Sequence, residues 1–189
     1  DLRMSRGLGD VYKRQDVSTL KGLDDFSRVG EYYMLAVEPA EQGYNASYIY
    51  CDEETMYIAR DQMRLLEGRL PQKEDEVVVS RYFLSNYGAD AGIGEKVMLS
   101  SESFHGEYTV TGIMEGYKEK EVNGTSILLS KEALKGWSGY DPADYRAYVH
   151  FKNEQQMDEI ELTARSREIA KEYQLEMPIM NLSYMKFYK

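Results

Sequence analysis

The residues of this chain best suited to chemistry are two histidines and two runs of carboxylates. His105 and His150 each lack a second histidine or a cysteine at the spacing that a zinc site needs. His150 is expected on the polar, solvated side of a strand. The acidic runs 52–54 and 74–76 would support acid–base chemistry only if a cleft raised the pKa of one carboxyl group. In turns, where we expect both runs, such carboxylates are solvated, so we expect no catalytic or metal site.

The glycine pair Gly92 and Gly94 does not have the pattern of a nucleotide-binding loop. A dinucleotide-binding loop needs a third glycine that opens a helix, and a P-loop needs a Gly-Lys-Ser/Thr sequence. Here the apolar run 97–99, which is typical of a strand, follows the pair. We therefore interpret it as a tight turn, and we expect no cofactor in this chain.

Four aromatic residues form the best candidate for a surface that contacts a partner or a ligand. Rigid aromatic side chains are common anchors of interfaces. A mixture of core and rim positions would explain the same residues. The four candidates are Trp137, Tyr140, Tyr145 and Tyr148.

Charge and composition argue against several classes of protein. The chain has 189 residues and a formal net charge of −10. Binding to nucleic acid or to anionic lipid requires clustered Lys and Arg, so the acidic balance argues against both. The single cysteine, Cys51, excludes an intrachain disulfide. No apolar run reaches the roughly 18–20 residues of a membrane-spanning helix.

The first fifteen residues resemble translated adapter sequence. Residues 10–15 back-translate to the end of a transposase adapter used for sequencing libraries, and residues 5–9 fit its upstream part in the same reading frame. We interpret residues 1–15 as an adapter-derived tail and expect them to stand outside the fold. The alternative is a short basic arm that belongs to the protein.

The expected elements mix strands and helices without a regular βαβ order. The clearest strand is 145–151, where apolar and polar residues alternate. Ser80 and Ser130 are expected to cap short helices, the first of which would end at Gly88 in a left-handed conformation. Further strands are expected at residues 32–37, 48–50, 76–79, 97–99, 107–114 and 127–129.

The longest helix is predicted to start with a capping box at Asn153 and to run to about Gln174. Glu161 and Arg165, one turn apart, are expected to pair. The inner face is expected to carry Leu162, Ser166, Ile169 and Tyr173, and a second face Met157, Ile160 and Ala164.

Three short patterns follow one another along the middle of the chain. They are Leu65-Leu66-Glu67-Gly68-Arg69-Leu70-Pro71 with the apolar run Val77-Val78-Val79, then Gly92-Ile93-Gly94-Glu95-Lys96-Val97-Met98-Leu99, then Tyr108-Thr109-Val110-Thr111-Gly112-Ile113-Met114-Glu115. In this order and spacing they resemble the extracytoplasmic domain of FtsX-like (MacB-type) ABC transporter permeases. The resemblance extends from about Val17 to the C-terminus.

The resemblance implies an α+β fold, in which a mixed sheet-and-helix domain carries a strand-rich inserted lobe, as in the MacB periplasmic core. Residues 16–189 would form the extracytoplasmic domain. Residues 16–75 and 140–182 would make the α+β lobe, residues 76–139 the strand-rich lobe, and residues 183–189 the start of a connection toward a missing membrane helix. Residues near Val17 and Asn181 are expected to lie close together.

The same resemblance implies a function at the cell membrane, with this domain on the extracytoplasmic side. The domain would couple ATP-driven motion of a partner subunit to transport or release of a substrate. Its partners would be the transmembrane helices of the same permease, a second permease copy or paralogue, and a cytoplasmic subunit that binds the ATP. The alternative is a freestanding secreted or envelope module that binds peptides or sugars; an enzyme is a third possibility.

Overall fold

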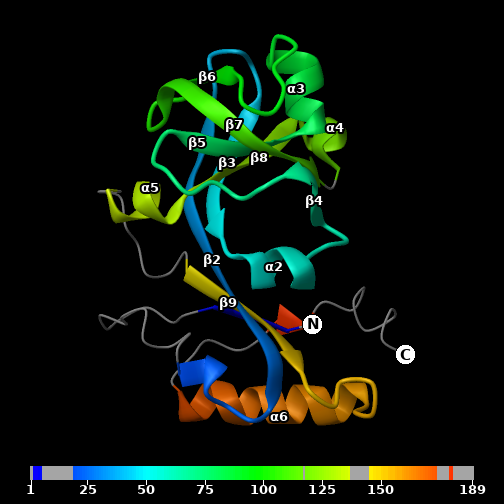
Figure 1. The fold of residues 1–189 in the computed structure, drawn as a ribbon. Coiled ribbons are helices and arrows are strands. Elements are labelled where there is room, and N and C mark those ends of the chain that lie inside the picture. Colours follow the sequence, from blue (N-terminus) through cyan, green and yellow to red (C-terminus); the bar gives the residue numbers. More distant parts are fainter. Residues whose placement is uncertain (1, 6–18, 117, 137–144, 174–178, 181–189) are drawn as a thin grey trace. The chain divides into compact units, whose positions relative to one another are not determined.

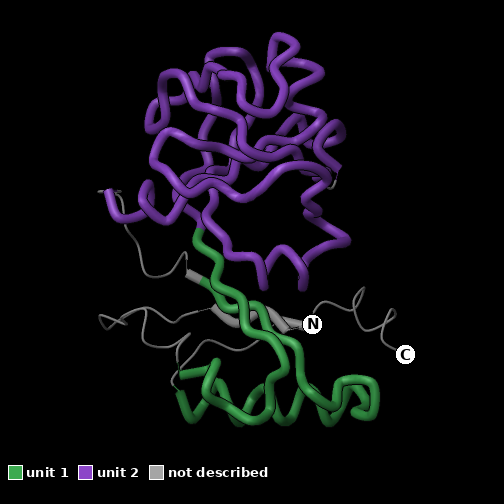
Figure 2. The backbone as a smooth tube through the Cα atoms, in the orientation of Figure 1, with its two compact units in different colours: residues 1–33, 141–189 green, residues 34–140 purple. Residues whose placement is uncertain are grey.

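The structure is a computed structural model that describes residues 2–5, 19–116, 118–136, 145–173 and 179–180 (Figure 1). The chain divides into two compact units (Figure 2). Unit 1 contains residues 1–33 and 141–189, and unit 2 contains residues 34–140. Unit 2 is therefore one continuous insertion between the two parts of unit 1. Helices and strands occur in both units, as the α+β prediction requires.

Unit 1 is built from a small sheet and one long helix, α6 (Glu159–Glu172). The strand order is β10-β1-β9-β2, so β9 is an interior strand of this unit. Its pairs with β1 and β2 are antiparallel, and β9 confirms the strand predicted from alternation. The strands are β1 (Leu2–Ser5), β9 (Tyr145–Phe151), β10 (Ile179–Met180) and the first part of β2 (Phe26–Pro39).

Helix α6 begins five residues later than the sequence predicts. Its N-cap is Asp158, whose side chain accepts a hydrogen bond from the backbone N–H of Glu161 at 2.8 Å. The Glu161 carboxylate in turn accepts from the backbone N–H of Asp158 at 3.3 Å. The predicted start at Asn153 is wrong, because the Asn153 carbonyl instead closes a turn that precedes the helix. A reciprocal pair that satisfies two backbone donors fixes the start at Asp158.

The two predicted faces of α6 differ in burial. Leu162, Ser166 and Ile169 are buried, as expected for the inner face, whereas Ile160 on the second face is 79% exposed. Arg165 does not pair with Glu161 as predicted. Its guanidinium donates to both carboxylate oxygens of Asp25, at 2.7 and 2.9 Å, and to Glu168 at 3.0 Å.

Unit 2 contains a mixed sheet in the order β2-β3-β8-β5-β7-β4, and β6 also pairs with β7. Two pairs are parallel, β3 with β8 and β5 with β7. All residues of β5 are buried, because β5 lies between β8 and β7. The sequence of an interior strand that is buried on both faces is typically a continuous apolar run. The bounds are β3 (Asn45–Cys51), β4 (Met63–Gly68), β5 (Glu76–Ser80), β6 (Lys96–Ser100), β7 (His105–Gly116) and β8 (Gly124–Leu129).

Four short helices lie in the described part of unit 2, and serines cap two of them. The Ser80 hydroxyl accepts from the backbone N–H of Phe83 at 3.0 Å, and the Ser130 hydroxyl accepts from that of Ala133 at 3.2 Å, which confirms both predicted caps. Gly88 is not left-handed, because its φ is −89°. A Cβ there would lie 2.6 Å from Leu84 Cα, so close packing explains the glycine. The helices are α2 (Glu53–Ile58), α3 (Arg81–Tyr87), α4 (Glu119–Val122) and α5 (Lys131–Lys135).

The division into units differs from the one predicted. Residues 34–75 were expected in the α+β lobe, but they belong to unit 2, because β3 pairs with β8 and β4 pairs with β7. Leu2–Ser5 were expected outside the fold, but they form β1. Residues 6–18 and 181–189 lie outside the described residues, and so do Val17 and Asn181. The adapter origin of residues 1–15 stays a prediction.

Replacing the cap of α6 distinguishes its two possible starts. We expect Asp158→Ala to lower the free energy of unfolding by about 1 kcal/mol, because a backbone N–H loses its acceptor. Asn153→Ala, the matched control, is expected to change it by less than about 0.5 kcal/mol. Urea denaturation followed by circular dichroism measures both. An equal loss in the two variants would contradict the start at Asp158.

Candidate functional site

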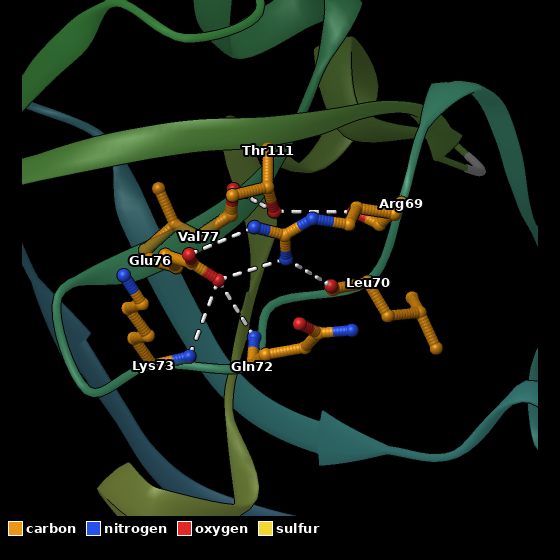
Figure 3. Close-up of polar contacts among 7 residues, drawn as sticks. All are labelled: Arg69, Leu70, Gln72, Lys73, Glu76, Val77 and Thr111. Atoms are coloured by element: carbon orange, nitrogen blue, oxygen red, sulfur yellow. Dashed lines mark hydrogen bonds and ion pairs between the residues drawn. The ribbon is translucent and has the colours of Figure 1, made fainter.

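An ion pair in unit 2 joins Arg69, after β4, to Glu76 at the start of β5 (Figure 3). The Arg69 guanidinium donates to both carboxylate oxygens of Glu76, each at 2.8 Å. The backbone N–H groups of Gln72 and Lys73 donate to Glu76 Oε2 at 2.8 and 3.2 Å. We call these four residues, with Thr111, the Arg69–Glu76 junction. It ties both ends of the turn that contains Pro71.

Four donors keep the Glu76 carboxylate ionised. The hydrogen bonds from Arg69 lower the pKa of Glu76 to about 2, with help from the two backbone N–H groups and against the effect of burial. A general acid or base needs a pKa near the working pH, so Glu76 is not suited to that role. The expectation that the run 74–76 is solvated is wrong for Glu76, which is 6% exposed. Glu74 and Asp75 are exposed.

Backbone hydrogen bonds join the other two patterns to the junction. The Arg69 N–H donates to the Thr111 carbonyl at 2.9 Å, and the Thr111 hydroxyl donates back to the Arg69 carbonyl at 3.1 Å. The turn at Gly94 docks on the same strand, because its N–H donates to the Val110 carbonyl at 2.8 Å. The Val110 N–H donates in return to the Glu95 carbonyl at 2.8 Å. The Glu95 N–H donates to the Gly92 carbonyl at 3.1 Å, and Gly94 has φ +86°, which confirms the predicted tight turn.

Two glycines allow these strands to approach one another. Gly68 has φ +79°, and a Cβ there would lie 2.1 Å from the Thr111 carbonyl oxygen. A Cβ on Gly112 would lie 2.7 Å from the Arg69 carbonyl oxygen. The close approach of β4 and β7 thus requires a glycine in the first pattern and a glycine in the third.

The predicted aromatic contact surface is only partly described. Trp137 and Tyr140 lie outside the described residues, and so does the side chain of Tyr145, although its backbone begins β9. Tyr148 is half-buried, and its ring packs edge-on against Tyr32 with centroids 5.6 Å apart. The surface stays a prediction.

The histidines occupy different environments. His105 is exposed, whereas His150 is 6% exposed, so its predicted solvation is wrong. Arg146 and Tyr148, on the same face of β9, are half-buried, so the burial of this polar face increases toward His150. In the part of the chain that the structure describes, no cluster of three or more His, Cys, Asp or Glu side chains is placed to hold a metal ion. None of the helices within the described ranges combines the length and apolarity needed to cross a bilayer.

An open hollow of about 500 Å³ lies beside β4 and the end of β7. Charged residues of both signs line it, and two of them, Arg64 and Glu115, form an exposed ion pair at 2.9 Å. Exposed pairs of this kind contribute little to stability.

The Arg69–Glu76 junction is expected to carry a large share of the stability of unit 2. Glu76→Gln should lower the free energy of unfolding by about 1–3 kcal/mol, because the buried group loses its charge-assisted hydrogen bonds. Glu115→Gln, the matched control at the exposed ion pair, should cost less than about 1 kcal/mol. Similar losses in both variants, measured by urea denaturation, would contradict the role of the junction.

The junction also predicts a dependence of stability on pH. Since the pKa of Glu76 is lower in the folded chain than its ordinary 4.5, its contribution is complete above that value and is lost as the pH falls toward about 2. The Asp25 carboxyl group, whose pKa Arg165 also lowers, contributes equally to wild type and to Glu76→Gln. The difference in unfolding free energy between the two proteins should therefore shrink on acidification. A constant difference would contradict the assignment.

The close approach at Gly68 is tested against a second glycine with positive φ. Gly68→Ala and Gly43→Ala both place a side chain in a left-handed conformation, at a cost of roughly 1–2 kcal/mol. Only Gly68→Ala also meets the Thr111 carbonyl, since the space around Gly43 is open within 4 Å. Thermal unfolding should show the larger loss for Gly68→Ala. Equal losses would mean that strand approach does not require this glycine.

Comparison with known proteins finds similarity in structure. No family model matches this sequence, and the search of curated proteins found no match. The extracellular domain of the ABC-type transporter YknZ from Gram-positive bacteria aligns with a TM-score of 0.61 at 14% identity, over 95% of this chain and 98% of that domain. The periplasmic region of MacB from Actinobacillus actinomycetemcomitans aligns with a TM-score of 0.61 at 10% identity, over 98% of this chain and 89% of that one. The chain therefore has the fold of the extracytoplasmic domains of MacB-type ABC transporter permeases, which confirms the resemblance seen in its sequence.

Proposed function

We propose that this chain is the extracytoplasmic domain of an FtsX-like ABC transporter permease. In this role it couples ATP-driven motion of a partner subunit to transport or release of a substrate at the outer face of the membrane. The observation that carries the proposal is the fold, which the chain shares over nearly its whole length with domains of two transporters. The order of the three sequence patterns supports the same assignment.

The division of the chain suits a domain held between two membrane helices. Residues 1–33 and 141–189 both belong to unit 1, and unit 2 is one insertion. Both connections to the membrane would then leave from unit 1. Unit 1 would receive the movement of the membrane helices, and unit 2 would follow through the chain segments that enter and leave it.

A domain that transmits force has to resist deformation, and each unit contains a bidentate arginine–carboxylate pair that joins separate elements. In unit 1, Arg165 of α6 binds Asp25, which directly precedes β2. In unit 2, Arg69 binds Glu76 at the junction. Such pairs fix orientation as well as distance. They support a mechanical role within each unit.

The proposed partners follow from this role. They are the transmembrane helices of the same permease, a second permease copy or paralogue, and a cytoplasmic subunit that binds and hydrolyses ATP. The domain itself would act at the extracytoplasmic side of the cell membrane without catalysing a reaction.

The sequence of the complete coding region tests whether the domain lies between two membrane-spanning segments. We expect a hydrophobic span of about 20 residues on each side of it, and a gene for an ATP-binding subunit nearby. A signal peptide before the domain and a stop codon directly after it would overturn the proposal. That result would favour a freestanding secreted or envelope module that binds peptides or sugars.

Movement of unit 2 tests the coupling. Ser85→Cys places a thiol on the exposed surface of α3, whereas the native Cys51 is buried and its pKa is raised by desolvation, so it should not react. In the full-length permease with its ATP-binding subunit, dyes at position 85 of two copies should change their energy transfer when ATP is added. A hydrolysis-deficient ATP-binding subunit is the control. Unchanged energy transfer during ATP hydrolysis would contradict the coupling.

A further inference from the structure

The dipeptide Asn123-Gly124, between α4 and β8, occurs once in the chain. Asparagine is a thermolabile residue, because the backbone nitrogen of the residue that follows it can attack its side-chain amide. A glycine in the following position has no Cβ to hinder that attack. Asn123 is also exposed, so water can reach it. The sequence and the exposure together make Asn123 a candidate for spontaneous deamidation.

Deamidation at this dipeptide needs water as its only co-reactant. The Gly124 backbone nitrogen bonds to Asn123 Cγ, the Cγ–Nδ2 bond breaks, and Nδ2 leaves as ammonia with the proton of the Gly124 amide. Water then opens the cyclic imide. Opening at Cγ gives aspartate, whereas opening at the backbone carbonyl carbon of residue 123 gives isoaspartate, in which the main chain runs through the former side chain. Neither step oxidises or reduces the chain.

The fold restrains Asn123 through its side chain and through both of its backbone polar groups. Its Nδ2 donates to the Gly43 carbonyl at 3.0 Å, and its carbonyl accepts from the Asn45 N–H at 3.0 Å. Its own backbone N–H donates to the Glu119 and Lys120 carbonyls at the end of α4. Its φ is +46°, the left-handed conformation in which asparagine can follow a helix. The amide group that has to react is therefore engaged in a hydrogen bond.

The products of deamidation cannot keep these contacts. A carboxylate at position 123 has no hydrogen to donate to the Gly43 carbonyl, and it places a negative charge beside that oxygen. Isoaspartate also lengthens the main chain between α4 and β8. Asn45 and Gly124 are the first pair of the parallel β3–β8 ladder, so the longer main chain displaces this pair.

We propose that Asn123 is the principal site of spontaneous deamidation in this chain, that the folded structure slows the reaction, and that the product releases the contacts with Gly43 and Asn45. The reaction proceeds from the minority of molecules in which these hydrogen bonds have opened. The rate of deamidation therefore reports how often this end of the β3–β8 ladder opens. The inference is independent of the proposed transport role, since it rests on contacts within unit 2.

Peptide mapping after incubation at mildly alkaline pH measures the reaction. Trypsin releases residues 121–131, whose only asparagine is Asn123, and liquid chromatography with mass spectrometry separates both products from the parent peptide. Conversion in the folded chain should be at least about tenfold slower than in the chain unfolded in urea, because only opened molecules react. In the unfolded chain, Gly124→Ala should slow conversion by at least about tenfold, because a methyl group hinders the attack. Asn45, which alanine follows, should be similarly slow there.

Asn123→Asp reproduces the loss of the amide donor and tests its consequence. Hydrogen exchange of the Asn45 N–H, followed by NMR, should become at least about tenfold faster, because the hydrogen bond from position 123 to Gly43 no longer forms. Asn86→Asp is the matched control. Asn86 Nδ2 donates to the Tyr82 carbonyl at 2.8 Å on the exposed surface of α3, so this variant loses a similar bond and gains the same charge. It should leave exchange at Asn45 unchanged.

Three results would overturn the proposal. The first is equal conversion of Asn123 in the folded and the unfolded chain. The second is another asparagine that converts as fast as Asn123 in the unfolded chain. The third is an equal effect of the two aspartate variants on exchange of the Asn45 N–H.

Discussion

The arrangement at the start of β5 in unit 2 depends on one buried carboxylate, that of Glu76, which accepts four N–H hydrogen bonds. Glu76 is the first residue of an interior strand, and removing its charge would weaken the hydrogen bonds that it accepts from the Arg69 guanidinium and from two backbone N–H groups. The pair costs desolvation, but four donors on one carboxylate offset that cost and hold the group in its charged form. The backbone N–H and carbonyl of Arg69 also form hydrogen bonds with Thr111 of β7. The carboxylate that holds Arg69 therefore helps to position β7, the strand on which the Gly94 turn docks.

This constraint links the chemistry of the chain to its proposed role. The acidic run 74–76, which was expected to be solvated, contributes a structural ion pair through Glu76, and the glycine pair forms a turn that docks on β7. Unit 1 contains a similar ion pair, between Arg165 and Asp25. Ion pairs that fix the orientation of elements within each unit, together with a fold shared with the domains of two transporters, support the mechanical role that we propose.

Local features of the fold were predictable from the sequence, whereas long-range pairing was not. The caps at Ser80 and Ser130 and the strand at 145–151 follow from neighbouring residues, and the structure confirms all three. Alternation shows which face of a strand is buried but not which strand pairs with it, so the parallel pairing of β3 with β8 and the resulting unit boundary were missed. At the site, an arginine and a glutamate at the two ends of a proline-containing turn were the available signal for the junction. The burial of Glu76 became evident only with the tertiary structure.

Native-state hydrogen exchange tests the central claim most directly, namely that the junction makes one cooperative block of the three patterns. The amides of Arg69, Gly94 and Val110 come from three separate segments and donate to three different carbonyls. We predict that they exchange with one common opening free energy, and that Glu76→Gln lowers all three by the same amount. Independent opening of the Gly94 amide, or a loss of protection confined to Arg69, would contradict the account.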